Sequence, residues 1–461
     1  MLVIAALLAA SLHPSGALEA VAAPAAHALA VPAPVAPDVT VRTAAARVVT
    51  VASEDQVDGL AQLRGRSFLR ALSALSPAEL RRAGRDAAVQ RVVLDHPPTA
   101  ADVEPWWGRL PAASRVALTT GAPQLIGNLE GIPYSTRDTA NRATLARLLD
   151  ASRADDGAGQ AGSKTAMLGQ IQAALRRGPG DPEKQLVTID TRGAGRAAIA
   201  LGDLDTASDV TVMVPGMFFT VTGQLVDWTA TGADLYREQA TVAPAAAVAT
   251  SRGQGSGVAV LAWMGYRTPG VSNVLSLDLA KVGATRLERV VAGIDRTRAS
   301  RPPRVSIVAH SYGSTTALLA LSAGRVHVDS LTLFGSPGSG VAAASELAVT
   351  AGQVFVGDAH WDPVAGTGIF GHDPGASGFG STLLDLAGGA DAVDIGDVLR
   401  RPFGHNGYLK PGTASLHDVA LIAVGRSDLV RHAGDDGSDG DGPPESPAFL
   451  VLRPQDPQLR D

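Results

Sequence analysis

Ser311 stands between an apolar run and a stretch of small residues, a position in which a serine can act as a nucleophile. The residues Val305–Ala309 are mostly β-branched or apolar, and Ser314–Leu321 has a helical composition, so the pattern predicts a strand, a sharp turn and a helix. Such a turn needs small residues two positions to either side of its apex, and Ala309 and Gly313 supply them. The hydroxyl would then project above the edge of a sheet.

A serine hydroxyl becomes a good nucleophile only when a base takes its proton, and a carboxylate usually orients that base. After a nucleophile on a strand-turn-helix motif, the acid and then the histidine commonly follow in the chain. We expect the base to be His405, in the glycine-flanked loop Phe403–Leu409. We expect the acid to be Asp362, just past the predicted strand Gln353–Gly357, with Asp358 as the alternative.

Three other histidines are given no part in this chemistry. His310, next to the serine, is expected to point away across the turn and to be structural. His417 falls within a predicted helix over Ser415–Val424, and His372 falls in a Gly-His-Asp-Pro-Gly turn.

An acyl-transfer site also needs donors for the developing oxyanion. The amide of Tyr312, at the start of the predicted helix, is one candidate. The strand Val212–Val214 ends in Pro-Gly, which can turn the amide of Met217 or Phe218 toward the site, and we take Met217 as the second donor. Phe218 and Phe219 would add an apolar wall to a substrate pocket.

Composition narrows the class of protein further. The 461 residues are 45% hydrophobic, enough for a globular chain of two or three domains. The net charge of −6 comes without a basic block, which argues against nucleic acid as a partner. With no cysteine, disulfides and thiolate sites are excluded. We expect no metal and no organic cofactor, and the sequence does not identify a protein partner.

The pattern along the chain predicts five regions. Residues 1–52 are an Ala/Pro-rich leader, in which the apolar run Met1–Leu12 suits a signal peptide but no Lys or Arg precedes Arg42. This leaves both an exported and a cytoplasmic location open, and the run is too short to span a bilayer. The other regions are a helical segment (53–150), a linker with one short helix (151–184), an α/β unit (185–430) and a flexible acidic tail (431–461).

Within the α/β unit, apolar strands alternate with helices. Strands are predicted over 185–190, 196–201, 210–214, 258–263, 328–334 and 353–357, and one of the helices over Ala342–Val349. Strands that are apolar on both faces indicate a mostly parallel sheet covered by helices. Sites in such folds form at the carboxyl ends of the strands, which is where Ser311 falls.

A set of short motifs spread over residues 100–425 carries a resemblance to a known family. The motifs are Trp106–Trp107, Gly127–Asn128–Leu129, Gly131–Ile132–Pro133, Arg137–Asp138, Ala140–Asn141–Arg142, Val214–Pro215–Gly216, Trp263–Met264–Gly265–Tyr266 with Pro269, His310–Ser314, Gly335–Ser336–Pro337–Gly338, Asp362–Pro363–Val364, Phe370–Gly371 with Asp373–Pro374, and His405 with Tyr408. The chain resembles the actinobacterial α/β-hydrolase family known only as a domain of unknown function, and more distantly the lipase and esterase superfamily. His-Asn-Gly-Tyr stands here where that family more often has His-Ser-Asp-Tyr.

The resemblance implies a helical N-terminal segment joined to an α/β-hydrolase core, with a triad of Ser311, Asp362 and His405. Together with the residues themselves it predicts a serine hydrolase acting on a small-molecule or lipid-like ester, less readily on a thioester or amide, through an acyl-enzyme. Two alternatives remain at this point: a non-catalytic binding or envelope protein on the same scaffold, and an acyltransferase with the same triad.

Overall fold

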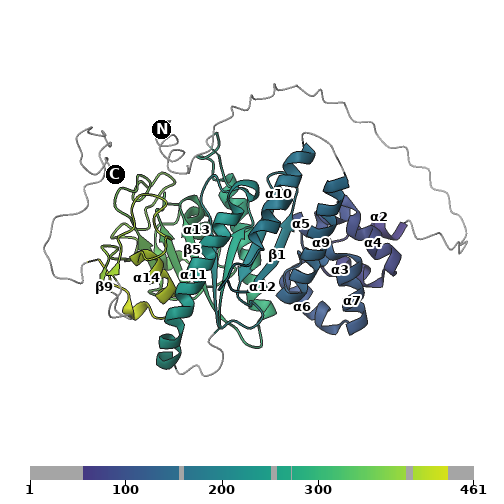
Figure 1. Ribbon diagram of the computed structural model, residues 1–461, viewed down its shortest axis with the longest axis horizontal. Helices are drawn as coiled ribbons and strands as arrows, with labels where there is room; N and C mark the ends of the chain where they lie inside the picture. The colour runs from purple at the N-terminus through teal and green to yellow at the C-terminus, as the bar shows by residue number, and fades with distance from the viewer. Residues whose placement is uncertain (1–54, 155–159, 251–256, 271, 391–397, 434–461) are drawn as a thin grey trace, which may run out of the picture.

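The computed structural model describes residues 55–154, 160–250, 257–270, 272–390 and 398–433. The leader expected at 1–52 and nearly all of the tail expected at 431–461 lie outside the described residues. Figure 1 shows a group of helices at one end of the molecule, followed by a sheet with helices on both sides. The predicted fold class, an α/β-hydrolase core after a helical segment, is confirmed.

The N-terminal helices build a small core of their own, on the right in Figure 1. A capping box at Ser76 and Glu79 starts one helix, and the side chain of Thr99 caps another. Trp106 and Trp107 are buried in this cluster. The elements are α2 (Asp55–Leu60), α3 (Gly65–Ala74), α4 (Pro77–Arg85), α5 (Ala87–Asp95), α6 (Ala100–Arg109), α7 (Ala112–Gly121), α8 (Pro123–Ile126), α9 (Tyr134–Ala154) and α10 (Gln160–Ala174).

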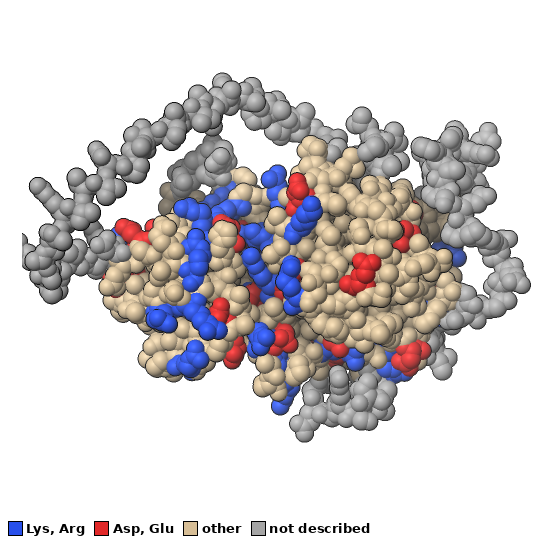
Figure 2. Space-filling view, turned by 180° about the vertical axis from the view of Figure 1, so that it is seen from behind, with Lys and Arg blue, Asp and Glu red and all other residues tan. Residues whose placement is uncertain are grey.

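The region predicted as a linker is largely helical. α9 continues to Ala154, and α10 occupies fifteen residues from Gln160, longer than the short helix that composition indicates. We refer to α2 to α9 together as the helical segment. Seen from behind in Figure 2, Lys and Arg side chains gather over this segment and its boundary with the rest of the protein.

One sheet organises the rest of the chain, with the strand order β1-β2-β4-β3-β5-β6-β7-β8. The strands from β4 to β8 pair in parallel, whereas β1 and β2 add antiparallel pairings at one edge. The bounds are β1 (Lys184–Asp190), β2 (Arg196–Leu201), β3 (Asp209–Val214), β4 (Val258–Met264), β5 (Arg304–His310), β6 (Ser330–Phe334), β7 (Val354–Gly357) and β8 (Thr382–Leu383). A second small sheet pairs β9 (Gly389–Ala390) with β10 (Val398–Leu399).

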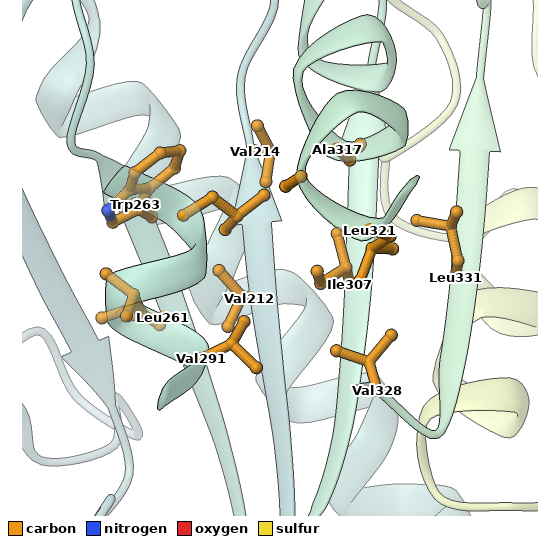
Figure 3. Packing of buried hydrophobic residues seen from close by; sticks show 14 of the residues in the cluster. Val212, Val214, Leu261, Trp263, Val291, Ile307, Ala317, Leu321, Val328 and Leu331 are labelled. Atoms are coloured by element: carbon orange, nitrogen blue, oxygen red, sulfur yellow. The ribbon is translucent and has the colours of Figure 1, made fainter. Parts of the chain in front are cut away.

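Helices cover both faces of the sheet, and alternate residues of each strand serve the two faces. Val212 and Ile307 pack toward α12 (Asp278–Thr297) and α13 (Tyr312–Ser322), as Figure 3 shows. Met213 and Val308 face the cluster formed with α10, α11 (Val221–Thr250) and α14 (Ala414–Ala423). Successive side chains point to opposite faces of the sheet, and the side chains on both faces are buried. This explains why the strands are apolar throughout. The thirty-residue α11 is not among the elements that the sequence pattern predicts.

The predicted helix over Ala342–Val349 is wrong. Only a single 3-10 turn, η1 (Ala344–Glu346), forms there. The backbone instead bonds to neighbouring elements, since the Ala348 amide donates to Leu321 and the Ala348 carbonyl accepts from Val328. These long-range hydrogen bonds replace the local ones that a helix would need. A second 3-10 turn, η2 (Ser427–Leu429), follows α14.

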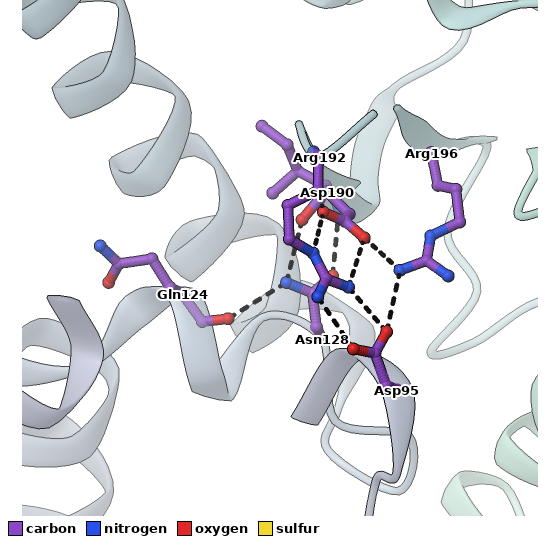
Figure 4. Close-up of polar contacts among 7 residues, drawn as sticks. Asp95, Gln124, Asn128, Asp190, Arg192 and Arg196 are labelled. Carbon is purple, nitrogen blue, oxygen red and sulfur yellow. Dashed lines mark hydrogen bonds and ion pairs between the residues drawn. The ribbon is translucent and has the colours of Figure 1, made fainter. Parts of the chain in front are cut away.

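Polar side chains attach the helical segment to the outer strand β1. Three of them bond its backbone: Asn128 to Ile189, Arg137 to the Val187 carbonyl and Asn141 to the Leu186 carbonyl. An edge strand presents unpaired amides and carbonyls, so these contacts satisfy groups that would otherwise be exposed or open to association. Gly127 must be a glycine here, because a β-carbon would overlap the side-chain oxygen of Asn141. Figure 4 shows the part of this junction around Asn128.

Candidate active site

Ser311 occupies a strained turn between β5 and α13. Its backbone has φ of 57° and ψ of −131°, a conformation that a residue with a side chain rarely adopts. The close approach beneath it explains the glycine at position 313, since a β-carbon there would lie 2.6 Å from the carbonyl oxygens of Val214 and Pro215. The Ser311 amide donates to the Phe334 carbonyl at 2.9 Å, which fixes the turn to the neighbouring strand. Strand, turn and helix therefore hold one serine hydroxyl at the carboxyl end of β5.

A second glycine lies directly against this serine. A β-carbon at Gly216 would be 2.8 Å from the Ser311 β-carbon and 3.3 Å from its hydroxyl oxygen. The Pro-Gly pair that follows β3 therefore lets the backbone at the end of this neighbouring strand lie close to Ser311.

His405 connects Ser311 to Asp362. Its Nε2 is 2.8 Å from the Ser311 hydroxyl oxygen, and its Nδ1 is 2.9 Å and 3.0 Å from the two carboxylate oxygens of Asp362. A carboxylate only accepts hydrogen bonds, so Nδ1 carries the proton and Nε2 is left to accept one from the serine. The three residues come from positions up to 94 apart in the chain, and all three are buried.

The surroundings of Asp362 favour its charged form. Burial raises the pKa of this carboxyl, but hydrogen bonds and charge from His405, a hydrogen bond from Tyr408 and the Val364 amide outweigh it, so the pKa lies below its ordinary value. Asp358, the alternative acid, is exposed and makes no hydrogen bond with His405 among the described residues. Of the two candidate acids, Asp362 is therefore the one whose carboxylate contacts the His405 imidazole.

Tyr408 is not among the site residues predicted from the sequence. Its hydroxyl donates to Asp362 Oδ2 at 2.5 Å and accepts from the Ala359 amide at 2.8 Å, while its ring stacks on Phe334. The sequence does contain a signal for this residue, because Tyr408 lies three residues after His405 and is one of the motif residues that carry the family resemblance.

Gly335, at the end of β6, makes room for the acid and the base. Its φ is +54°, and a β-carbon would lie 2.5 Å from Asp362 Oδ2 and 3.0 Å from His405 Nδ1. Both the backbone conformation and the space require a glycine. The Gly-Ser-Pro-Gly motif thus contributes to the site without supplying a reacting group.

The expected orientation of His310 is wrong. Its ring does not point away from the site but lies 4.6 Å, centroid to centroid, from the ring of His405. Its Nε2 donates to the His405 carbonyl oxygen at 2.6 Å, since that oxygen can only accept. Burial, followed by the neighbouring His405, lowers the pKa of His310 to about 3. His310 is therefore a neutral support for the loop that carries His405.

The two expected oxyanion donors are both next to residues of this turn: Tyr312 follows Ser311, and Met217 follows Gly216, which lies against Ser311. Tyr312 is the first residue of α13, and its amide has no hydrogen-bond acceptor among the described residues. The amide of Met217 likewise has none in the same part of the chain, whereas the Phe218 amide donates to Pro269 at 3.0 Å. Of the two candidates after the Pro-Gly turn, Met217 is thus the one whose backbone N–H is available to an oxyanion.

Phe218 and Phe219 do not share one environment. Phe218, with φ of +63°, packs against the cluster on the α12 side of the sheet. Phe219 packs on the opposite side, edge to face with Trp228 at 5.1 Å. The side chains therefore diverge rather than forming a single wall.

The remaining predicted residues lie outside this arrangement. His417 Nδ1 lies 2.8 Å from Glu238 on α11, and His372 pairs through its backbone with Ser339. The described ranges contain no group of three His, Asp or Glu side chains placed to hold a metal ion. Among the same residues no helix has the length and apolar character needed to cross a membrane.

Comparison with known proteins gives a family and several relatives. A family described as "Alpha/beta hydrolase" matches residues 190–371. An uncharacterized Mycobacterium tuberculosis protein is 29% identical over 389 residues, which cover 73% of this chain and 57% of the relative. An uncharacterized Mycobacterium bovis protein is 31% identical over 232 residues, covering 49% of this chain and 81% of the relative. The chain thus spans a little over half the length of the first relative.

Solved structures are similar at lower identity. A dienelactone hydrolase from Anabaena variabilis is 14% identical with a TM-score of 0.30, covering 54% of this chain and 100% of that one. An S-formylglutathione hydrolase from Agrobacterium tumefaciens is 12% identical with a TM-score of 0.33, covering 54% and 97%.

Proposed function

Because the chain belongs to the α/β hydrolase family, we propose that it is a serine hydrolase that cleaves carboxylic esters through an acyl-enzyme. Ser311 is the nucleophile, His405 the general base and then acid, and Asp362 the group that orients the imidazole. The observation that carries the proposal is the continuous set of hydrogen bonds from the Ser311 hydroxyl through His405 to Asp362, at 2.8 Å and 2.9 Å.

In the first half-reaction, the Ser311 oxygen attacks the ester carbonyl carbon while His405 Nε2 takes the hydroxyl proton. The amides of Tyr312 and Met217 bind the oxyanion of the tetrahedral intermediate. The imidazolium, stabilised by Asp362, then protonates the leaving alcohol as the ester bond breaks. The acyl group remains on Ser311.

In the second half-reaction, His405 takes a proton from a water molecule that attacks the acyl-enzyme. A second tetrahedral intermediate forms at the same two amides and collapses, and the proton returns to Ser311. An acid is released and the free enzyme is restored. Ser311 and His405 are only 1% and 6% exposed, so the reaction takes place in surroundings largely shielded from water.

Apolar side chains beside the triad support a lipid-like ester as the substrate. Trp361, adjacent to Asp362, is 41% exposed, and Phe403, two residues before His405, is 64% exposed. Phe403 and His360 form a β-bridge, and the rings of His360 and Trp361 are in contact, so these apolar groups come from neighbouring loops. Exposed large apolar groups at a site mark contact with an apolar ligand.

The test is hydrolysis of p-nitrophenyl esters of increasing acyl length by the purified protein. Ser311→Ala should lower kcat/KM at least about a thousandfold while the far-UV circular dichroism is unchanged. The matched control is Ser322→Ala, an exposed serine at the end of the same helix, which should retain full activity. Equal turnover by the wild-type and Ser311→Ala proteins would refute the assignment.

A further inference from the structure

A cavity lies where the helical segment meets the core, apart from the proposed triad. Its volume is about 70 Å³, enough for several water molecules or one small ion. Its lining includes Arg196 from the start of β2, Trp263 and Gly265 from the end of β4, and Arg286 and Arg289 from α12. Since β3 lies between β4 and β5, this cavity is not part of the site at Ser311.

Most charges around the cavity are paired. Arg192 binds both Asp95 and Asp190, and Arg196 binds Asp190, as Figure 4 shows. Glu130, which also lines the cavity, forms an ion pair with the fully buried Arg137. The positive charges of Arg192 and Arg196 thus balance the negative charges of Asp95 and Asp190. The charges of Arg137 and Glu130 balance in the same way.

Arg286 and Arg289 are left without such partners. Neither has an ion pair or a hydrogen bond among the residues that the structure describes, and both are only half-exposed. Glu288, between them in the chain, is taken up by a two-bond pair with Arg325. When Arg192, Arg137 and Asp95 beside the lining are counted with it, the cavity and its surroundings therefore carry two positive charges in excess.

The two unpaired cations lie in an unfavourable setting. Burial, and then the charge of Arg196, lowers the pKa of Arg289. A buried charge without a partner costs free energy that an anion would offset. The indole N–H of Trp263, which also has no hydrogen-bond acceptor within the described ranges, adds a neutral donor to the same lining.

We propose that this cavity is a binding site for a phosphate-type oxyanion, either the free ion or the phosphate group of an ester. Arg286 and Arg289 bind its oxygens and Trp263 donates a further hydrogen bond. Guanidinium groups match the oxygens of phosphate in geometry and charge, and a dianion balances the excess of two positive charges. An occupied site would lie between the helical segment and α12 of the core.

Inorganic phosphate is the first probe, added to the full-length protein at constant ionic strength with chloride as the comparison. We expect saturable binding by calorimetry and a higher Tm in phosphate than in chloride. Glycerol phosphate is the second probe: tighter binding of it assigns the site to a phosphate ester, and tighter binding of the free ion assigns it to phosphate itself. No difference between phosphate, glycerol phosphate and chloride would overturn the proposal.

Arg286→Gln and Arg289→Gln should each weaken phosphate binding about tenfold or more, since each removes charged hydrogen bonds. The control is Arg296→Gln, on the same helix but exposed and outside the lining, which should bind as the wild type does. If Arg289→Gln does not fold, Arg286→Gln carries the test. Unchanged phosphate affinity in a folded Arg286→Gln or Arg289→Gln protein would contradict the site. Ser311→Ala should bind phosphate as the wild type does, whether or not the protein is an esterase.

Discussion

The Tyr408 hydroxyl donates a hydrogen bond to Asp362 Oδ2 at 2.5 Å, so the carboxylate that faces His405 is held by a second side chain. The Ala359 amide in turn donates to the Tyr408 oxygen at 2.8 Å. The phenol of Tyr408 therefore connects the loop after β7 to the loop that carries His405. Tyr408 touches no reacting atom and acts by positioning Asp362.

Tyr408→Phe should lower kcat about tenfold and reduce the free energy of unfolding by about 1–3 kcal/mol, because it leaves the Ala359 amide unpaired and removes one of the two hydrogen bonds to Asp362 Oδ2. The tyrosine hydrogen bond helps to hold the pKa of Asp362 low, so its loss should raise that pKa and move the acid-side loss of activity to higher pH. A kcat–pH profile measures this shift. Tyr236→Phe on α11, away from the triad, should leave the profile unchanged, and an unshifted profile in Tyr408→Phe would show a purely structural role.

The two candidate acids differ in what they contact, and substitution separates them. Asp362→Asn should lower kcat by about three to four orders of magnitude, because a neutral amide no longer selects the Nδ1–H form of His405 or stabilises the imidazolium. Asp358→Asn, at an exposed position, should retain activity within a fewfold. Both are compared by kcat for one p-nitrophenyl ester. The reverse ranking would mean that Asp358 is the acid in solution.

The elements that surround Ser311 follow from local patterns. Strands with apolar residues on both faces, and small residues two positions to either side of one serine, predict β5, the turn and α13 because these depend on residues close in the chain. Asp362 could be chosen because it falls just past a predicted core strand, and His405 because it lies in a glycine-flanked loop late in the chain, before the last predicted helix. The same local logic fails at Ala342–Val349, where long-range backbone hydrogen bonds override a helical composition.

Other features depend on contacts that no local pattern contains. The place of His310 against His405 brings together the end of β5 and a loop 95 residues later, and the Tyr408–Asp362 bond spans 46 residues. The cations of Arg286 and Arg289 gain significance only because the helical segment packs beside α12 and its acidic side chains there are already paired. Such tertiary relationships are decided by packing and by the pairing of charges.

Gly216→Ala tests the close approach of β3 to the nucleophile. A methyl group 2.8 Å from the Ser311 β-carbon must displace either the serine or the Met217 amide, so kcat/KM should fall at least about tenfold. Gly340→Ala is the control, because its β-carbon would meet nothing within 4 Å among the described residues. Both variants are assayed on the same ester after a thermal melt confirms folding. Full activity in Gly216→Ala would mean that this backbone does not help to form the site.

His310 makes stability depend on pH. Its pKa is about 3 in the folded protein and 6.5 ordinarily, so below pH 6.5 the unfolded chain binds a proton that the folded protein does not. The contribution of His310 to the free energy of unfolding is thus fully present above pH 6.5. It falls as the pH drops toward 3, by up to about 1.4 kcal/mol per pH unit. His310→Gln keeps a donor for the His405 carbonyl but does not titrate. Denaturant unfolding between about pH 7 and 4 should give a shallower loss of stability in this variant, and parallel curves would exclude a buried neutral His310.

Activation of the Ser311 hydroxyl by His405 is the central claim, and covalent labelling with a fluorophosphonate probe tests it most directly. We expect the wild-type protein and Ser322→Ala to gain one probe adduct, peptide mass spectrometry to place it on Ser311, and Ser311→Ala to gain none. An unlabelled wild-type protein, or an adduct that persists in Ser311→Ala, would contradict the claim.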